Sequence, residues 1–126
     1  MFEQIDPRSA TPLYAQIAHR IKVGIASGEL RPGAGLPSVR QLAGQLRLNP
    51  ATVVQAYREL ESEGFVEMRQ GAGTFVREVD ATRRSEERAG EARRLIRAML
   101  ADAASLGMSA GELRTAFDRE LGGASQ

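Results

Sequence analysis

Apolar residues recur at helical spacing along the first part of this chain. Leu13 begins a stripe that repeats every three or four residues as far as Ile25, which is the period expected when one face of a helix is buried. Pro12 suits the first position of a helix, and Gly28 suits the residue that ends one. The pattern predicts a first helix, followed by a loop over residues 29–37, because that stretch holds two prolines and two glycines.

Two further helices follow in close succession. Ser38 and Gln41 have the spacing of a capping box, at the start of a short amphipathic helix that ends near Leu48. Asn49 is then suited to cap a helix over residues 49–64, with a proline at its first position and a glycine at its end. Only a tight turn fits between the two, which is the layout of a helix-turn-helix. The apolar face of the third helix comprises Val53, Ala56, Tyr57 and Leu60.

A short β-hairpin is predicted after the third helix. Residues 65–69 and 74–77 are rich in aromatic and branched side chains, and a glycine-containing turn separates them. Three helices followed by a hairpin is the order of a winged helix-turn-helix, in which the hairpin is the wing. We therefore expect a mainly α fold with a small β-hairpin, and a winged helix-turn-helix domain over residues 1–77.

The remaining residues, 78–126, predict a short helical segment. Residues 78–91 are polar and mixed in charge, which fits either a linker or the exposed first part of a helix. An apolar stripe then predicts a helix over about residues 85–106, and a capping box formed by Ser109 and Glu112 starts a last helix over about residues 110–121.

The apolar stripes of these two helices must pack against other apolar residues, and so short a segment does not supply enough of them. Antiparallel pairing of the helices, completed by a second copy of the chain, would bury them in a small bundle. We therefore expect a homodimer held by a C-terminal dimerisation segment. The residues expected at this interface are Leu95, Ile96, Met99, Leu100, Ala103, Leu106, Leu113 and Phe117.

Composition narrows the function classes. The 126 residues, 42% of them hydrophobic, suffice for one ordinary core or a small domain with a helical appendage. There is no cysteine and His19 is the only histidine, so we expect no metal site and no cofactor. Neither a long apolar run nor a signal-peptide pattern is present, so we expect a cytoplasmic protein without a membrane partner. No set of nucleophile, base and orienting group suggests an enzyme.

Local charge is more informative than net charge. The 17 basic and 16 acidic residues nearly balance, so bulk charge does not indicate a nucleic-acid partner. Residues 30–58, however, contain four arginines and no acid, whereas four glutamates follow between residues 59 and 67. The basic stretch covers the start of the third helix and the segment before it, where a nucleic-acid contact is expected.

Several motifs, in order, resemble the DNA-binding domain of the GntR family of bacterial transcription factors. They are GELRPG at residues 28–33, LPSVRQLA at 36–43, NPATV at 49–53, AYRELE at 56–61, GFV at 64–66 and GAGTFV at 71–76. The tail, with LGMS at 106–109 and EL at 112–113, is similar to the YtrA-like subfamily, whose members carry a two-helix dimerisation segment instead of a large effector-binding domain. The resemblance implies a homodimeric repressor that binds double-stranded DNA, often at a transporter operon.

The same resemblance implies where DNA would be contacted. Arg40 is expected near phosphate or guanine, the start of the helix over residues 49–64 in the major groove, and the tip of the wing over residues 65–77 toward the minor groove. The residues expected at DNA are Ser38, Arg40, Asn49, Pro50, Ala51, Thr52, Gln55, Arg58, Arg69, Gln70 and Gly71. Ala51 and Gln55 stand where the subfamily commonly has a hydrogen-bonding residue and a lysine, so the base preference stays open.

The chemistry of these side chains suits DNA independently of the resemblance. An arginine such as Arg40 can bind guanine O6 and N7 with two hydrogen bonds, and the amides of Asn49 and Gln55 can pair with adenine. The methyl group of Thr52 can contact that of thymine. Arg58 fits either a phosphate contact or an ion pair along its helix, and Tyr57 is expected in the core.

A second function class remains open from the sequence. The winged helix could serve as a protein-interaction module, with the acidic run between Glu59 and Glu67 as the docking face. The sequence also leaves open the operator, the genes regulated, the dimer geometry, the existence of a small-molecule effector, and the choice between repression and activation.

Overall fold

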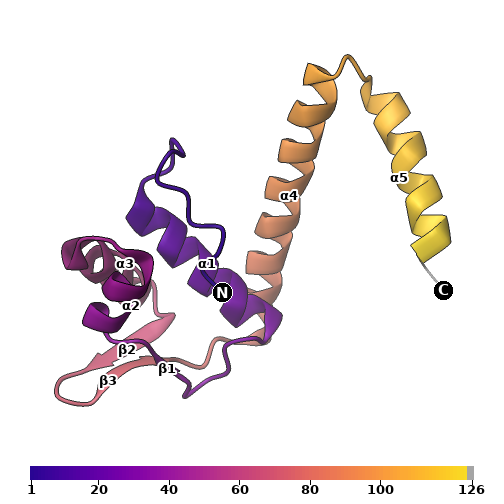
Figure 1. The fold of residues 1–126 in the computed structure, drawn as a ribbon. Coiled ribbons are helices and arrows are strands. Elements are labelled where there is room, and N and C mark those ends of the chain that lie inside the picture. Colours follow the sequence, from indigo (N-terminus) through magenta and orange to yellow (C-terminus); the bar gives the residue numbers. More distant parts are fainter. Residues whose placement is uncertain (125–126) are drawn as a thin grey trace. The chain divides into compact units, whose positions relative to one another are not determined.

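The computed structural model describes residues 1–124 (Figure 1). Residues 125 and 126, the last two of the predicted segment 78–126, lie outside the described residues. The chain forms two compact units, Met1–Arg88 and a second unit from Ala89 onward. The first unit extends beyond the predicted domain 1–77, because the first two turns of the fourth helix pack with it.

The first unit consists of three helices and a small antiparallel sheet, in the order expected for a winged helix-turn-helix. The sheet has the strand order β1-β3-β2, so β3 lies in its middle. The elements are α1 (Leu13–Ser27), β1 (Gly35–Leu36), α2 (Val39–Leu46), α3 (Pro50–Ser62), β2 (Val66–Arg69) and β3 (Gly73–Val76).

The sheet corrects one sequence-based expectation. The stretch 29–37 was predicted to be entirely loop, yet Gly35 pairs with Phe75 and Leu36 with Thr74 to form β1. The pairing extends past the strand, because the Val76 N–H donates to the Ala34 carbonyl oxygen at 2.9 Å. The wing hairpin therefore has a third strand, which anchors the segment before α2 to the sheet.

The core of the first unit comes from the faces that the helical periodicity predicted. Ile17 and Ile21 of α1, Leu42 of α2 and Phe65 at the start of the wing are all 0–1% exposed. The predicted apolar face of α3, comprising Val53, Ala56, Tyr57 and Leu60, is 0% exposed throughout.

Local capping signals determine where α2 and α3 begin, as predicted. The Ser38 hydroxyl accepts a hydrogen bond from the Gln41 N–H at 3.0 Å, and the Gln41 side chain accepts from the Ser38 N–H at 2.9 Å. Asn49 Oδ1 accepts from the Ala51 N–H at 2.9 Å, and Pro50 occupies the first position of α3. Each cap satisfies an amide that would otherwise have no partner within the helix.

The turn between these helices contains a strained residue. Arg47 ends α2 in the left-handed region, with φ 56°, and is the only non-glycine residue with positive φ in the described chain. The N–H groups of Arg47 and Leu48 both donate to the Ala43 carbonyl oxygen, which closes the end of α2. A side chain in this conformation costs about 1 kcal/mol relative to the usual helical region.

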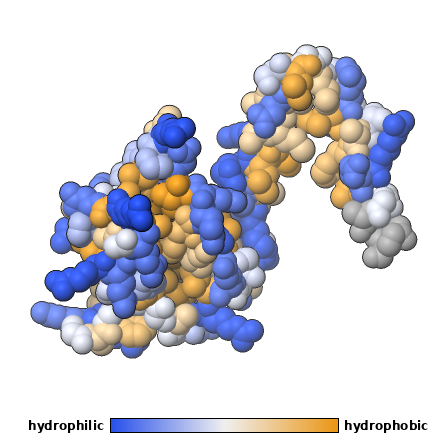
Figure 2. Space-filling model, in the orientation of Figure 1, coloured by the Kyte–Doolittle hydropathy of each residue, from blue (hydrophilic) through white to orange (hydrophobic). Residues whose placement is uncertain are grey.

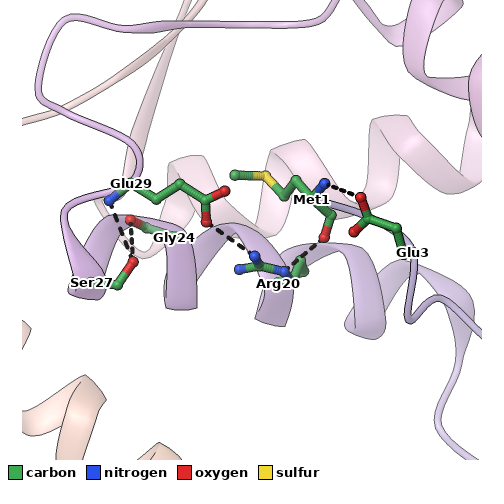
Figure 3. Close-up of polar contacts among 6 residues, drawn as sticks. All are labelled: Met1, Glu3, Arg20, Gly24, Ser27 and Glu29. Atoms are coloured by element: carbon green, nitrogen blue, oxygen red, sulfur yellow. Dashed lines mark hydrogen bonds and ion pairs between the residues drawn. The ribbon is translucent and has the colours of Figure 1, made fainter.

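A network at Arg20 fastens the N-terminal lead-in to α1 (Figure 3). Arg20 Nε donates to the Met1 carbonyl oxygen at 2.7 Å, and Arg20 Nη2 pairs with Glu29 Oε1 at 3.0 Å. The same guanidinium therefore connects α1 both to the start of the chain and to the loop that follows the helix.

Residues 78–91 were predicted to be either a linker or the exposed first part of a helix. Most of them belong to the helix α4 (Ala81–Ser105). The segment is helical from Ala81, earlier than the predicted start near residue 85. Asp80 Oδ1 accepts from the Arg83 N–H at 2.8 Å and so caps the helix start. Mixed charge thus marks an exposed helix face here, since opposite charges along a helix do not oppose its formation.

A second helix completes the C-terminal unit. α5 (Ala110–Ala124) starts at the predicted capping box, where Ser109 Oγ accepts from the Glu112 N–H at 3.1 Å. The turn before it passes through Gly107, whose φ of 76° favours glycine. α5 continues past the end expected near residue 121. None of the helices in residues 1–124 is both long enough and apolar enough to cross a lipid bilayer.

Candidate nucleic-acid interface

The predicted DNA-contact residues all lie at the surface of the first unit. Ten of the eleven are exposed, and Thr52 is half-buried. They come from the start of α2, the start and outward face of α3, and the tip of the wing. The structure therefore leaves the whole predicted set accessible to a ligand.

Arg40 of α2 and Gln55 and Arg58 of α3 are exposed polar residues. Within residues 1–124, these three side chains have no hydrogen bond or ion pair. The positions four residues from Arg58 along α3 are Val54 and Ser62, so the helix offers that arginine no i, i+4 ion pair. The guanidinium groups are thus free to bind an anion such as phosphate.

Capping restricts what Asn49 can do. Its Oδ1 atom already accepts from the Ala51 N–H at 2.9 Å, so a paired contact with adenine would share that oxygen with the cap. The side-chain amide of Gln55, further along α3, makes no hydrogen bond within the described residues. Of the two amides predicted to pair with adenine, Gln55 is therefore the freer one.

The tip of the wing is held in shape by its own side chains. The Arg69 guanidinium lies 4.7 Å from the centre of the Phe75 ring and 3.5 Å from the Glu67 carboxylate. Cation–π attraction of this kind contributes about 0.5–1 kcal/mol at an exposed site. Gly71, with φ 80°, allows the tight turn between β2 and β3.

An open hollow of about 470 Å³ separates the start of α2 from the wing. It brings Ser38 together with Arg69, Gln70 and Gly71 of the predicted set. The first turn of α2 and the glycine-containing turn of the wing meet there. Arg69, which lines the hollow, carries a cation that can attract a phosphate group.

The hydroxyl of Tyr57 determines how α3 sits against the start of α2. The Tyr57 hydroxyl donates to the Pro37 carbonyl oxygen at 2.6 Å, and the residue is 0% exposed. Burial raises the pKa of the Tyr57 phenol well above its usual range, which keeps it a neutral donor. The apolar spacing along α3 predicted the burial of Tyr57, but it carried no signal for this hydrogen bond.

Arg47 is an exposed cation that the sequence-based site did not include. It lies in the turn directly before α3, and it has no ion pair or hydrogen bond from its side chain in the described residues. Its signal in the sequence was its place in the acid-free stretch 30–58. Its left-handed backbone was not predictable, because glycine or asparagine usually takes that conformation.

The acidic run between Glu59 and Glu67 is largely engaged inside the first unit. Glu63 pairs with Lys22 at 2.6 Å, Glu61 accepts from the Met68 N–H at 2.9 Å, and Glu67 contacts Arg69. Glu63 and Glu61 thus connect the end of α3 to α1 and to the wing, whereas the Glu67 contact lies within β2, so two of the four carboxylates are committed to the fold.

The second unit exposes the apolar surface that was predicted to form a dimer interface (Figure 2). Leu95, Ile96 and Leu106 are 56%, 49% and 77% exposed. Ala103 differs, because it is only 5% exposed within the single chain and offers a partner little surface. An open groove of about 400 Å³ between α4 and α5 is lined by Ile96, Met99, Leu100, Ala110, Leu113, Arg114 and Phe117.

Comparison with known proteins identifies the first unit. The model of the family described as "Bacterial regulatory proteins, gntR family" matches residues 13–76. The chain is 51% identical over 75 residues to the HTH-type transcriptional repressor YtrA of Bacillus subtilis. That match covers 60% of this chain and 58% of the relative, so it spans less than two thirds of the relative's length.

Two solved structures add to this comparison, one that aligns with nearly the whole chain and one that was solved in complex with DNA. YtrA of Sulfolobus acidocaldarius, a GntR-family transcription factor, aligns over 98% of this chain and 99% of its own, with 35% identity and a TM-score of 0.55. The DNA-binding domain of AraR in complex with operator ORX1 aligns over 56% of this chain and 88% of its own, with 33% identity and a TM-score of 0.52.

Proposed function

Because the chain belongs to the gntR family of bacterial regulatory proteins, we propose that it is a sequence-specific, DNA-binding transcriptional repressor that acts as a homodimer. The observation that carries the proposal is the exposed set Arg40, Gln55 and Arg58, whose side chains have no partner within the described residues. That set lies on the two helices of a helix-turn-helix. In this role the protein is a cytoplasmic regulator and not an enzyme, and it needs no cofactor.

The recognition helix over residues 49–64 enters the major groove in this proposal. A helix fits that groove, and side chains at its start reach base edges. Gln55 and Thr52 would read bases, while Arg40 and Arg58 would hold phosphate or guanine. The wing over residues 65–77 points toward the minor groove, where Gln70 and the backbone at Gly71 approach the DNA. The solved complex of the AraR DNA-binding domain with an operator supports DNA binding by this fold.

The helical segment over residues 78–126 would hold two copies together. Its support is the apolar surface of α4 and α5, which the single chain leaves exposed. A two-fold dimer presents two recognition helices to two half-sites, so the operator is expected to be pseudo-palindromic with half-sites about one helical turn apart. A transporter operon is the target that the subfamily resemblance of the sequence implies.

Selection of bound fragments from the source genome tests the proposal. The purified full chain should enrich a pseudo-palindromic motif, and its affinity for that motif should fall steeply as salt rises. Arg40→Ala should lose enrichment, whereas Arg97→Ala, which removes an exposed arginine of the second unit, should retain it. Equal affinity for every duplex tested would refute sequence-specific repression.

A further inference from the structure

Three arginines of the first unit converge on a hollow that the DNA-binding proposal does not use. The hollow has a volume of about 430 Å³ and lies beside the end of α1, the loop before β1 and the start of α4. Arg31, Arg77 and Arg84 line it together with the apolar side chains of Ile25, Leu30 and Val79.

The lining residues of the hollow include no acid, although Glu78 and Asp80 flank Val79 in the sequence. The nearby Glu29 is paired with Arg20 (Figure 3), and Asp80 accepts from the Arg83 N–H at the start of α4. The side chains of Arg31, Arg77 and Arg84 have no ion pair or hydrogen bond within residues 1–124. Three like charges at one hollow repel one another, so an anion bound among them would be stabilised.

Backbone hydrogen bonds hold the segments around the hollow in place. The Gly33 N–H donates to the Val76 carbonyl oxygen at 2.8 Å, which ties the turn after Arg31 to the end of β3. The residue directly after β3 is Arg77, whose N–H donates to the Phe65 carbonyl oxygen at 2.9 Å. Two of the three arginines therefore lie on segments that are hydrogen-bonded to the sheet.

The third arginine is positioned by its neighbours on α4. The Arg83 guanidinium lies 4.2 Å from the centre of the Phe65 ring and donates to the Glu63 carbonyl oxygen. One turn later, Arg88 Nη1 donates to the Ala26 carbonyl oxygen of α1 at 3.1 Å. These contacts hold the first two turns of α4, which carry Arg84, against the rest of the first unit. Preorganisation of this kind lowers the entropic cost of binding.

We propose that this hollow binds a small organic anion, with a carboxylate or phosphate group held by the arginines and an apolar portion against Ile25, Leu30 and Val79. Guanidinium groups bind both oxyanions with paired hydrogen bonds. The volume lies within the range of roughly 300–1,000 Å³ that is usual for small-molecule sites. The DNA backbone is the less fitting occupant, because Arg77 follows the end of β3 that is farthest from the hairpin turn at residues 70–72.

Titration of the full chain with three probes tests this site. The probes are inorganic phosphate, phenyl phosphate and benzoate, followed by calorimetry and by the NMR signals of the arginine side chains. Phenyl phosphate should bind about tenfold more tightly than inorganic phosphate, because its ring adds apolar burial. Comparison with benzoate distinguishes a phosphate site from a carboxylate site, and saturable binding of either aromatic anion supports the proposal.

Matched variants localise the binding. Arg77→Gln and Arg84→Gln should each weaken binding of the tighter aromatic probe by about tenfold, since each removes a charge-assisted contact. Arg31→Gln, in an exposed loop, provides a third variant if either of the others lowers thermal stability. Arg119→Gln, which removes an exposed arginine of α5, should leave the affinity unchanged.

Two results would overturn the proposal. One is the absence of saturable binding by both aromatic anions, and the other is binding that all three hollow variants retain. If the hollow variants instead weaken duplex DNA binding as much as Arg40→Ala while neither aromatic anion binds, the arginines contact DNA and the small-anion site does not exist. Because the titration contains no DNA, its outcome is independent of the repressor proposal.

Discussion

The hydroxyl of Tyr57 donates a 2.6 Å hydrogen bond to the carbonyl oxygen of Pro37, twenty residues earlier in the chain. Pro37 directly precedes the Ser38 cap of α2, and Tyr57 lies in the middle of α3. One buried side chain thereby couples the position of Arg40 to that of the recognition helix.

Removal of this hydroxyl should destabilise the fold. Tyr57→Phe keeps the ring but leaves the Pro37 carbonyl oxygen without its donor, so the free energy of unfolding should fall by about 1–2 kcal/mol. Urea denaturation followed by circular dichroism would measure the loss. Tyr14→Phe, which changes a half-buried tyrosine of α1, serves as the control. An unchanged midpoint for Tyr57→Phe would show that the hydrogen bond contributes nothing net.

The same tyrosine should make stability fall at alkaline pH. Burial raises the pKa of Tyr57 in the folded state, whereas the unfolded tyrosine ionises near its usual value of about 10. The unfolded chain therefore loses this proton first, and stability that is fully present below about pH 10 should decline above it by about 1.4 kcal/mol per pH unit. The decline should be shallower in Tyr57→Phe, as denaturation at several pH values would reveal.

Relief of the strained turn should stabilise the protein. Arg47→Gly places glycine where φ is 56° and should raise the free energy of unfolding by up to about 1 kcal/mol. Arg47→Ala removes the same charge while keeping a side chain in the left-handed conformation, so the difference between the two variants isolates the backbone. Equal thermal stability of the glycine and alanine variants would contradict this account.

The exposed arginines should differ in their effects on DNA binding. Arg58→Ala, if it removes a phosphate contact, should weaken binding about equally for all duplexes and reduce the salt slope by about one. Arg40→Ala, if it removes a guanine contact, should cost about 1–3 kcal/mol and relax specificity at one base pair. Fluorescence anisotropy at several salt concentrations separates these outcomes. Indistinguishable affinities for Arg40→Ala and the unmodified chain would reject a DNA contact at Arg40.

Charge in the apolar groove of the second unit should disrupt the dimer. Ile96→Glu and Leu100→Glu place a carboxylate on the exposed apolar surface of α4, and a buried charge without a partner is strongly unfavourable at an interface. Sedimentation equilibrium should show a shift from dimer to monomer. Ala101→Glu adds the same charge to the opposite side of α4, and the dimer should persist in that variant. A monomeric mass for the unmodified chain at high concentration would refute dimerisation.

Part of the candidate site was predictable from residue spacing alone. The exposure of Gln55 and Arg58 follows from the apolar face of α3, because the positions opposite a buried helix face point to solvent. The cation–π contact of Arg69 with Phe75 and the commitment of Glu61 to the Met68 N–H were not predictable. The first contact forms only when β2 pairs with β3, and the second forms only when the wing folds against α3.

The sequence by itself determined the order of the elements, the starts of α2 and α3, and the apolar face of each helix, because caps and helical periodicity act between residues within a few positions of one another. Only the tertiary structure decided the rest. It added β1 through pairing with β3, bonded Tyr57 to Pro37, and gathered Arg31, Arg77 and Arg84 around one hollow. Those features depend on contacts between residues twenty or more positions apart, for which neither propensity nor spacing carries a signal.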